Sequence, residues 1–124
     1  MAAFARRAIE LALEDRDAAA ANDGWTFFDR SLIDAAAALD HVAQEGALRR
    51  LGTLHRYHPR VFMTPPWPAI YATDADRQHD LEAAVAEYHR LLTAYEMLGY
   101  AIAIVPQASV KARADWMQDR LDCE

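Results

Sequence analysis

The chain has 124 residues, of which 53% are hydrophobic and 26% are charged, and its formal net charge is -6. This length is enough for one modest domain with its own core, and the composition is that of a globular protein. The negative net charge argues against a protein that coats nucleic acid or an anionic membrane. No apolar run approaches the roughly 20 residues that span a bilayer. The single cysteine, Cys123, leaves no internal disulfide and fits a reducing, cytoplasmic location.

The first half of the chain predicts helices around one short strand. Apolar residues at helical spacing predict an amphipathic helix over residues 2–22, which ends in an Asn-Asp-Gly turn. The aromatic and β-branched run WTFF, at 25–28, predicts a buried strand. Ser31 is placed to cap a helix that runs through 33–43, and a shorter helix is expected around ALRRL, at 47–51.

The second half predicts a strand, a long helix, a strand and a last helix. RVFMT, at 60–64, is typical of a strand, and TPPWP after it must be extended because proline fixes φ and restricts the residue before it. A helix is expected over 75–97, then the apolar strand YAIAIV at 100–105, then a helix that Ser109 caps. The apolar face of the long helix would comprise Leu81, Val85, Tyr88, Leu92 and Tyr95.

Strands separated by helices predict an α/β fold with a parallel sheet and right-handed crossovers. The near-continuous apolar strands favour a sheet with helices on both faces. We expect about three strands, in a single domain that spans residues 1–124. Aromatic side chains are expected to lie in the core, namely Trp25, Phe27, Phe28, Trp67, Tyr88 and Tyr95.

In an open parallel sheet the ligand binds at the carboxyl ends of the strands. Three segments follow predicted strands, at 29–31, 65–67 and 106–108. Asp29 is the leading candidate, because an acid at a strand end can hold a metal ion beside a nucleotide phosphate. The alternative is structural: Asp29 caps the following helix and forms an ion pair with Arg30.

Acidic residues are absent from residues 46–73, which contain four arginines and two histidines. Guanidinium groups pair well with phosphate, so Arg56 and Arg60 are candidate phosphate ligands. A solvated basic face, or arginines that pair with acids elsewhere in the fold, would produce the same pattern.

Several segments resemble a family of small bacterial predicted ATPases, which are P-loop proteins of the AAA-type grouping and are related in architecture to nucleoside and nucleotide kinases. The most specific segment is VFMTPPWPAIYATDADR, residues 61–77, and the second is FFDR, residues 27–30. LGYAIAIVP and RADW continue the resemblance, which covers essentially the whole chain. It implies a three-layer α/β/α fold like that of P-loop NTPases, helix-rich and incomplete in this chain.

The resemblance also implies a site for ATP and Mg²⁺. Asp29 would hold the Mg²⁺ from a Walker B-like position, and Arg30 would be a catalytic residue that faces the phosphates. Arg77 falls where such proteins place a mobile lid with phosphate-contacting arginines. A small-molecule phosphate acceptor is a further expected partner, whereas nucleic acid and membrane are not expected. Three residues after the last strand would border the adenine, namely Pro106, Gln107 and Ser109.

The sequence departs from this family in one large respect. Intact members begin with a strand and a G-x-x-x-x-G-K-[ST] loop, whose amides and lysine hold the β- and γ-phosphates. None of the four glycines here belongs to such a motif, and the only lysine is Lys111. We therefore expect either a fragment or a chain that closes the gap in its sheet by rearrangement or by forming a homo-oligomer through bare strand edges. ATP hydrolysis by this chain alone is expected to be weak or absent.

Two further functions fit the sequence. A non-catalytic α/β interaction module would dimerise through strand edges and the helix at 2–22, and the missing P-loop favours it. A binder of small anions or phosphate-sugars would use the arginines of residues 46–73 alone.

Overall fold

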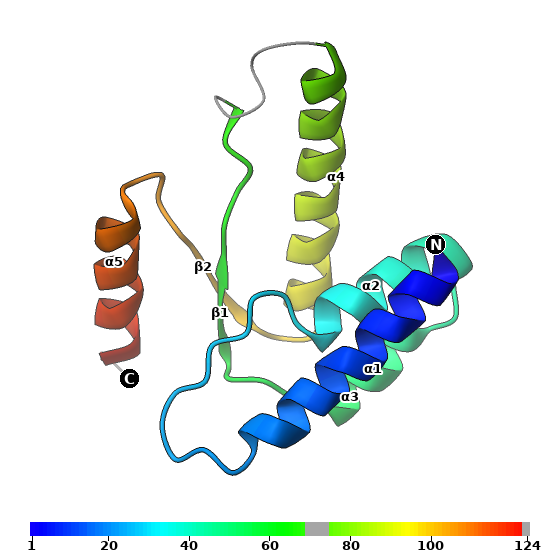
Figure 1. Ribbon diagram of the computed structural model, residues 1–124, viewed down its shortest axis with the longest axis horizontal. Helices are drawn as coiled ribbons and strands as arrows, with labels where there is room; N and C mark the ends of the chain where they lie inside the picture. The colour runs from blue at the N-terminus through cyan, green and yellow to red at the C-terminus, as the bar shows by residue number, and fades with distance from the viewer. Residues whose placement is uncertain (69–74, 123–124) are drawn as a thin grey trace. The chain divides into compact units, whose positions relative to one another are not determined.

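The computed structural model describes residues 1–68 and 75–122, with the side chains of all of these except 75–78. The chain divides into two compact units, Met1–Tyr57 and His58–Glu124, which we call unit 1 and unit 2. It is a helix-rich α/β protein with a small parallel sheet (Figure 1); the predicted single domain stays a prediction. The elements in chain order are α1 (Ala2–Ala19), α2 (Leu32–Ala43), α3 (Ala47–Leu54), β1 (Arg60–Met63), α4 (Ala75–Met97), β2 (Ala101–Ile104) and α5 (Val110–Asp122).

Unit 1 is built around α2, which packs against both α1 and α3. The sequence LIDAAAALDHVA gives this helix a run of small alanines, which let its neighbours approach closely. Leu32 and Ile33 are fully buried, and α1 contributes Ala5 and Ile9 to the buried residues of the unit. Burying a side chain of the size of leucine or isoleucine stabilises the fold by about 1.5–3 kcal/mol. The predicted cap is confirmed, because the Ser31 side chain accepts a hydrogen bond from the amide of Ile33.

A carboxylate joins the end of α2 to the start of α3. Asp40 accepts hydrogen bonds from the amides of Ala47 (2.8 Å) and Leu48 (2.9 Å) in the first turn of α3. The connection between the helices turns sharply, because Gln44 and Gly46 adopt left-handed conformations with φ of 53° and 71°. Glycine takes this conformation without steric cost. Gly46 has no side chain with which to cap α3, so Asp40 supplies the acceptors that the helix start needs.

Unit 2 contains a β-α-β unit whose two strands pair in parallel. Arg60 lies opposite Ala101, and Met63 lies opposite Ile104. The amide of Val105 also donates to the carbonyl of Met63 (2.9 Å), which continues the pairing beyond the end of β2. The structure thus confirms the prediction of parallel pairing, and it places β1 and β2 within the predicted ranges 60–64 and 100–105.

Helices α4 and α5 lie on either side of the strand pair (Figure 1). On one side α4 contacts β2, and on the other Trp116 of α5 meets Phe62 of β1 edge-on, with ring centroids 6.1 Å apart. The predicted apolar face of α4 is buried mainly at its C-terminal end, where Tyr95 is buried, whereas Val85 is exposed. Burial raises the pKa of the Tyr88 hydroxyl above its ordinary value, so this group stays protonated at neutral pH.

A left-handed glycine ends α4 and turns the chain into β2. Gly99 has φ of 85°, and its amide donates to the carbonyl of Glu96 (3.0 Å). The amide of Tyr100 donates to the carbonyl of Tyr95 (3.1 Å), and the two tyrosine rings are in contact with centroids 5.5 Å apart. This pair of bonds with its apolar contact is a Schellman motif. The predicted helix bounds of 75–97 and the predicted stop at Gly99 are both confirmed.

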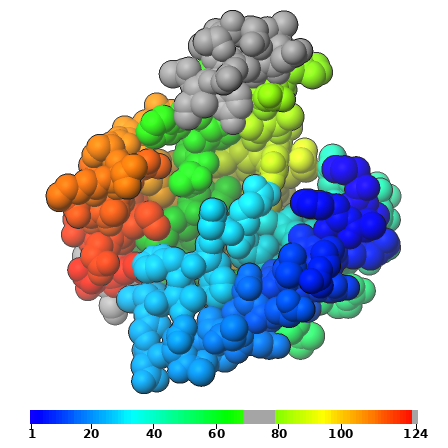
Figure 2. Space-filling view, viewed as in Figure 1, coloured from blue at the N-terminus to red at the C-terminus, as the bar shows by residue number. Residues whose placement is uncertain are grey.

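The predicted strand at 25–28 is wrong. The described residues contain two strands, β1 and β2, rather than about three. Trp25 and Phe27 were expected in the core but are 52% and 62% exposed, and their segment lies on the surface in Figure 2. The preference of aromatic residues for strands depends on pairing and packing in a sheet, and unit 1 contains only helices. The first helix also ends earlier than expected, at Ala19.

None of the helices in the described ranges has the length and apolarity that crossing a membrane requires.

Replacing Asp40 by Ala is expected to lower the free energy of unfolding by about 1–3 kcal/mol, because two amides at the start of α3 lose a charged acceptor. Asp40→Asn keeps one acceptor oxygen and should give an intermediate value. Urea unfolding followed by circular dichroism measures both changes. Asp119→Ala removes an exposed acid from α5 and is the control, with an expected change below about 0.5 kcal/mol. Equal effects of Asp40→Ala and Asp119→Ala would show that Asp40 does not support α3.

Candidate functional site

The leading candidate residue, Asp29, lies in the short turn of residues 29–31 that precedes α2, which we call the acid turn. Its side chain is exposed. Arg30, the next residue, has φ of 64°, and Ser31 returns to an extended conformation as the N-cap of α2. An arginine in the left-handed region is uncommon, because its Cβ crowds the following carbonyl oxygen. The acid turn therefore holds its two charged side chains on a sharply bent backbone.

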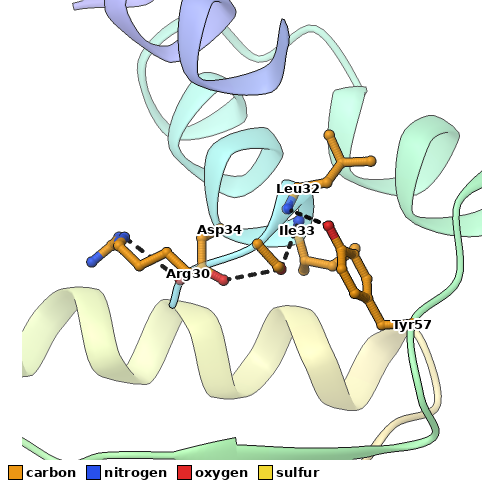
Figure 3. Close-up of polar contacts among 6 residues, drawn as sticks. Arg30, Leu32, Ile33, Asp34 and Tyr57 are labelled. Carbon is orange, nitrogen blue, oxygen red and sulfur yellow. Dashed lines mark hydrogen bonds and ion pairs between the residues drawn. The ribbon is translucent and has the colours of Figure 1, made fainter. Parts of the chain in front are cut away.

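The first amides of α2 are already hydrogen-bonded within unit 1 (Figure 3). The amide of Leu32 donates to the hydroxyl of Tyr57 (3.0 Å), and the amide of Ile33 donates to Oγ of Ser31 (3.1 Å). The Ser31 hydroxyl in turn donates to Oδ1 of Asp34 (3.4 Å). Helix N-termini commonly bind anions through such amides. Here both amides point to internal acceptors, so these two donors are not open to a phosphate.

The structure does not contain the two contacts that the structural alternative for Asp29 and Arg30 predicted. Ser31, and not Asp29, caps α2, and Arg30 forms its ion pair with Asp34, at 3.8 Å between Nε and Oδ2. The Arg30 side chain is 60% exposed in this pair, whereas that of Asp34 is 12% exposed. In the part of the chain that the structure describes, the Asp29 carboxylate makes no hydrogen bond or ion pair. It is therefore available to a ligand.

The donor set of the acid turn fits Mg²⁺ only in part. Mg²⁺ in phosphate-transfer sites takes one or two carboxylates and completes its shell with phosphate oxygens and water. Asp29 can provide one such carboxylate. The described residues hold no group of three or more His, Cys, Asp or Glu side chains that could bind a metal ion by themselves. A cation at Asp29 would thus have to arrive with a phosphate ligand, which is how Mg·ATP binds.

The predicted phosphate ligands are distributed over both units. Arg56 is exposed near the end of unit 1, where its carbonyl accepts a hydrogen bond from Arg16 (3.0 Å). Arg60 is half-buried in β1, and its amide donates to Nδ1 of His58 (3.1 Å). Arg77 belongs to the first turn of α4, and its side chain lies outside the described part of the structure.

The predicted base-binding residues lie at the carboxyl end of β2, as the sequence requires. Pro106 and Gln107 are exposed. The Ser109 hydroxyl accepts a hydrogen bond from the amide of Ala112 (3.1 Å), which confirms it as a cap of α5. Its expected contact with adenine stays a prediction.

Sequence reasoning missed one cation in unit 2, Arg113 in the first turns of α5. Its guanidinium carbon lies 5.2 Å from the centroid of the Trp67 ring, in the segment that follows β1. The Nε atom of Arg113 is buried and has no hydrogen-bond partner among the described residues. Arg113 therefore joins the segment after β1 to the helix after β2. The only sequence feature that pointed to Arg113 was its place in the RADW segment. The spacing of the residues in that segment did not indicate Trp67 as its partner.

The fold and the acid turn together define a helix-rich α/β protein with a parallel β-α-β unit and, before a capped helix, a carboxylate that no described residue engages. A comparison with protein families matches residues 1–113 to an AAA domain. The chain therefore belongs to the AAA domain family, which groups it with the P-loop-type, nucleotide-binding ATPases. No curated protein and no solved structure matches the chain.

The backbone of Arg30 gives a direct test of the acid turn. Arg30→Gly removes the steric cost of the left-handed conformation and Arg30→Ala keeps it, while both variants lose the exposed ion pair with Asp34. We expect Arg30→Gly to be more stable than Arg30→Ala by about 1 kcal/mol in urea unfolding. The same pair of substitutions at Arg90, an exposed residue inside α4, should give the opposite order, because glycine weakens a helix interior. Equal stabilities of the two Arg30 variants would contradict the left-handed turn in solution.

Proposed function

We propose that this chain forms part of an AAA-type nucleotide site that binds Mg·ATP through the acid turn. In this proposal Asp29 holds the metal ion, Arg30 and Arg77 contact phosphate oxygens, and residues 106–109 border the adenine. Arg56 and Arg60 are further candidates for the phosphates. The membership of the chain in the AAA domain family supports a nucleotide as the ligand. The three-layer sheet of P-loop NTPases and a kinase-like architecture are part of the same proposal.

The observation that carries the proposal is the pair formed by Asp29, which no described residue engages, and Arg30, which has a positive φ. A residue held at positive φ costs about 1–2 kcal/mol, and such residues cluster at binding sites where the surrounding structure holds them. Glycine would avoid that cost at position 30. The chain has arginine there, directly after a carboxylate that no described residue engages.

The chemistry supported by these groups is phosphoryl transfer by positioning and charge neutralisation. Bound Mg²⁺ would supply positive charge to the phosphate oxygens. Asp29 would fix the position of that ion, and the Arg30 guanidinium would place a second positive charge beside the phosphates. To reach them, Arg30 would exchange its weak, 60% exposed ion pair with Asp34 for a charge-assisted hydrogen bond to phosphate. The acceptor of the phosphoryl group would be water or a small hydroxylated molecule.

The proposed site also needs a phosphate-binding loop, and residues 1–124 do not contain one. The amides and lysine of a P-loop are the main source of affinity for the β- and γ-phosphates. We therefore propose that the chain alone binds Mg·ATP weakly and hydrolyses it slowly or not at all. Turnover of ATP by the 124-residue chain at an ordinary enzyme rate, above about 1 per second, would overturn this part of the proposal.

Asp29→Asn is expected to remove the dependence of ATP binding on Mg²⁺. In the wild-type chain, ATP should bind at least about fivefold more tightly with Mg²⁺ than with EDTA, which is the size of one charge-assisted contact. The measurement is an amide chemical-shift titration with millimolar ATP, because such titrations detect weak binding. Asp23→Asn, an exposed acid in the same loop, is the control and should keep the wild-type ratio. A wild-type ratio in Asp29→Asn would refute the metal-binding role.

A second candidate function is a non-catalytic module that associates with a second copy of the chain. The observation in its favour is the small sheet, in which each of the two strands has one edge that pairs with no other strand of the described residues. Ile104, in β2, is 52% exposed. Unpaired edges favour association with another chain.

Light scattering after size exclusion tests the second candidate. If the chain is such a module, we expect a stable dimer whose mass is the same with and without Mg·ATP. Ile104→Lys, at the end of β2, should shift the dimer toward the 13.9 kDa monomer, because a charge there disfavours edge pairing. A monomer at all concentrations up to about 100 μM would exclude the module as the main function.

A further inference from the structure

Tyr57, at the end of unit 1, makes contacts that reach back to both sides of the acid turn. Its hydroxyl accepts a hydrogen bond from the amide of Leu32, at 3.0 Å and 25 residues away in sequence. Its ring meets the ring of Phe28 edge-on, with centroids 5.6 Å apart. Phe28 directly precedes Asp29, and Leu32 directly follows Ser31. The turn is therefore held on each side by the same side chain.

The hydrogen bond to the amide of Leu32 matters for stability, because Leu32 is 0% exposed and water cannot replace the acceptor. A buried backbone amide needs an acceptor, and losing it costs more than an exposed hydrogen bond contributes. The N–H of the first residue of a helix has no acceptor within that helix. The Tyr57 hydroxyl meets this need from outside α2, and Figure 3 shows the contact from Tyr57 to the start of the helix.

Tyr57 is itself held by α1. The guanidinium of Arg16 lies 4.5 Å from the centroid of the Tyr57 ring, and its Nη1 donates to the carbonyl of Arg56, the neighbouring residue, at 3.0 Å. A cation over an aromatic face contributes about 0.5–1 kcal/mol at a site of this exposure. The side chain and the backbone beside Tyr57 are thus both anchored, so its hydroxyl occupies a fixed place.

We infer that Tyr57 is a positioning residue for the nucleotide site: its hydroxyl and ring fix the acid turn so that Asp29 faces the ligand. This inference rests on the proposed function, because the turn matters for binding only if Asp29 holds the metal ion. Tyr57 touches neither nucleotide nor metal in this assignment. It acts through Phe28 on one side of the turn and through Leu32 on the other.

The test variant is Tyr57→Phe, which keeps the ring contacts with Phe28 and Arg16 and removes only the hydroxyl. Tyr88→Phe is the matched control, since it removes a hydroxyl from a half-buried tyrosine of unit 2. The first readout needs no nucleotide. Amide hydrogen exchange at Leu32 should become at least about fivefold faster in Tyr57→Phe, while exchange in α4 is unchanged. The backbone chemical shifts of Arg30 should also move away from those of a left-handed residue. Unchanged exchange at Leu32 would overturn the inference without affecting the proposed function.

The second readout is the ratio of ATP affinities with Mg²⁺ and with EDTA, measured with the full chain at a temperature where every variant is folded. Tyr57→Phe should reduce this ratio by about threefold or more, and Tyr88→Phe should leave it unchanged. If Tyr57 contributes to stability alone, Tyr57→Phe will have a lower melting temperature and a wild-type ratio. That outcome would overturn the positioning role. If Asp29→Asn also keeps the wild-type ratio, the proposed function fails, and the positioning role falls with it whatever the exchange data show.

Discussion

Leu32, the first residue of α2, lies in the core of unit 1, and the form of the acid turn depends on the burial of the helix start. Leu32 and Ile33 are 0% exposed, so their amides cannot rely on water. One amide finds the Tyr57 hydroxyl and the other finds Oγ of Ser31. For Ser31 to reach back over the helix start, the chain must enter α2 from an extended residue. Arg30 makes the bend into that residue with its left-handed backbone, which leaves Asp29 on the exposed side.

The free-energy contributions at the start of α2 show why Arg30 keeps its left-handed conformation. The left-handed conformation of Arg30 costs about 1–2 kcal/mol. Two satisfied amides avoid a penalty of about 1–3 kcal/mol each, and the burial of Leu32 and Ile33 adds about 1.5–3 kcal/mol for each side chain. The packing of α2 is therefore large enough to offset the strain in the absence of a ligand. A preformed turn is useful for binding, because ligand affinity is not spent on ordering it.

Local patterns predicted those elements that local interactions determine. The bounds of α4, the stop at Gly99 and the parallel strands follow from helical spacing, a glycine at C′ and a β-α-β order, and all were confirmed. The prediction of a strand at WTFF failed because a strand needs a neighbouring strand, which unit 1 does not contain. The role of Tyr57 could not be predicted, since its partner amide is 25 residues away and nothing at 57 marks it. The ion pair of Arg30 with Asp34, in place of the expected pair with Asp29, could not be predicted either, because it depends on the left-handed turn.

The occupied amides of Leu32 and Ile33 constrain how a phosphate could bind at the acid turn. In P-loop proteins, backbone amides at the start of a helix hold the phosphates together with a lysine. The amides of Leu32 and Ile33 already have acceptors, and Lys111 forms an ion pair with Asp115 at 2.7 Å. A phosphate at the acid turn would therefore depend more on arginine side chains than on these two amides. The cluster of arginines between residues 46 and 73, where the sequence has no acid, gains significance from this constraint, because guanidinium groups bind phosphate without helix amides.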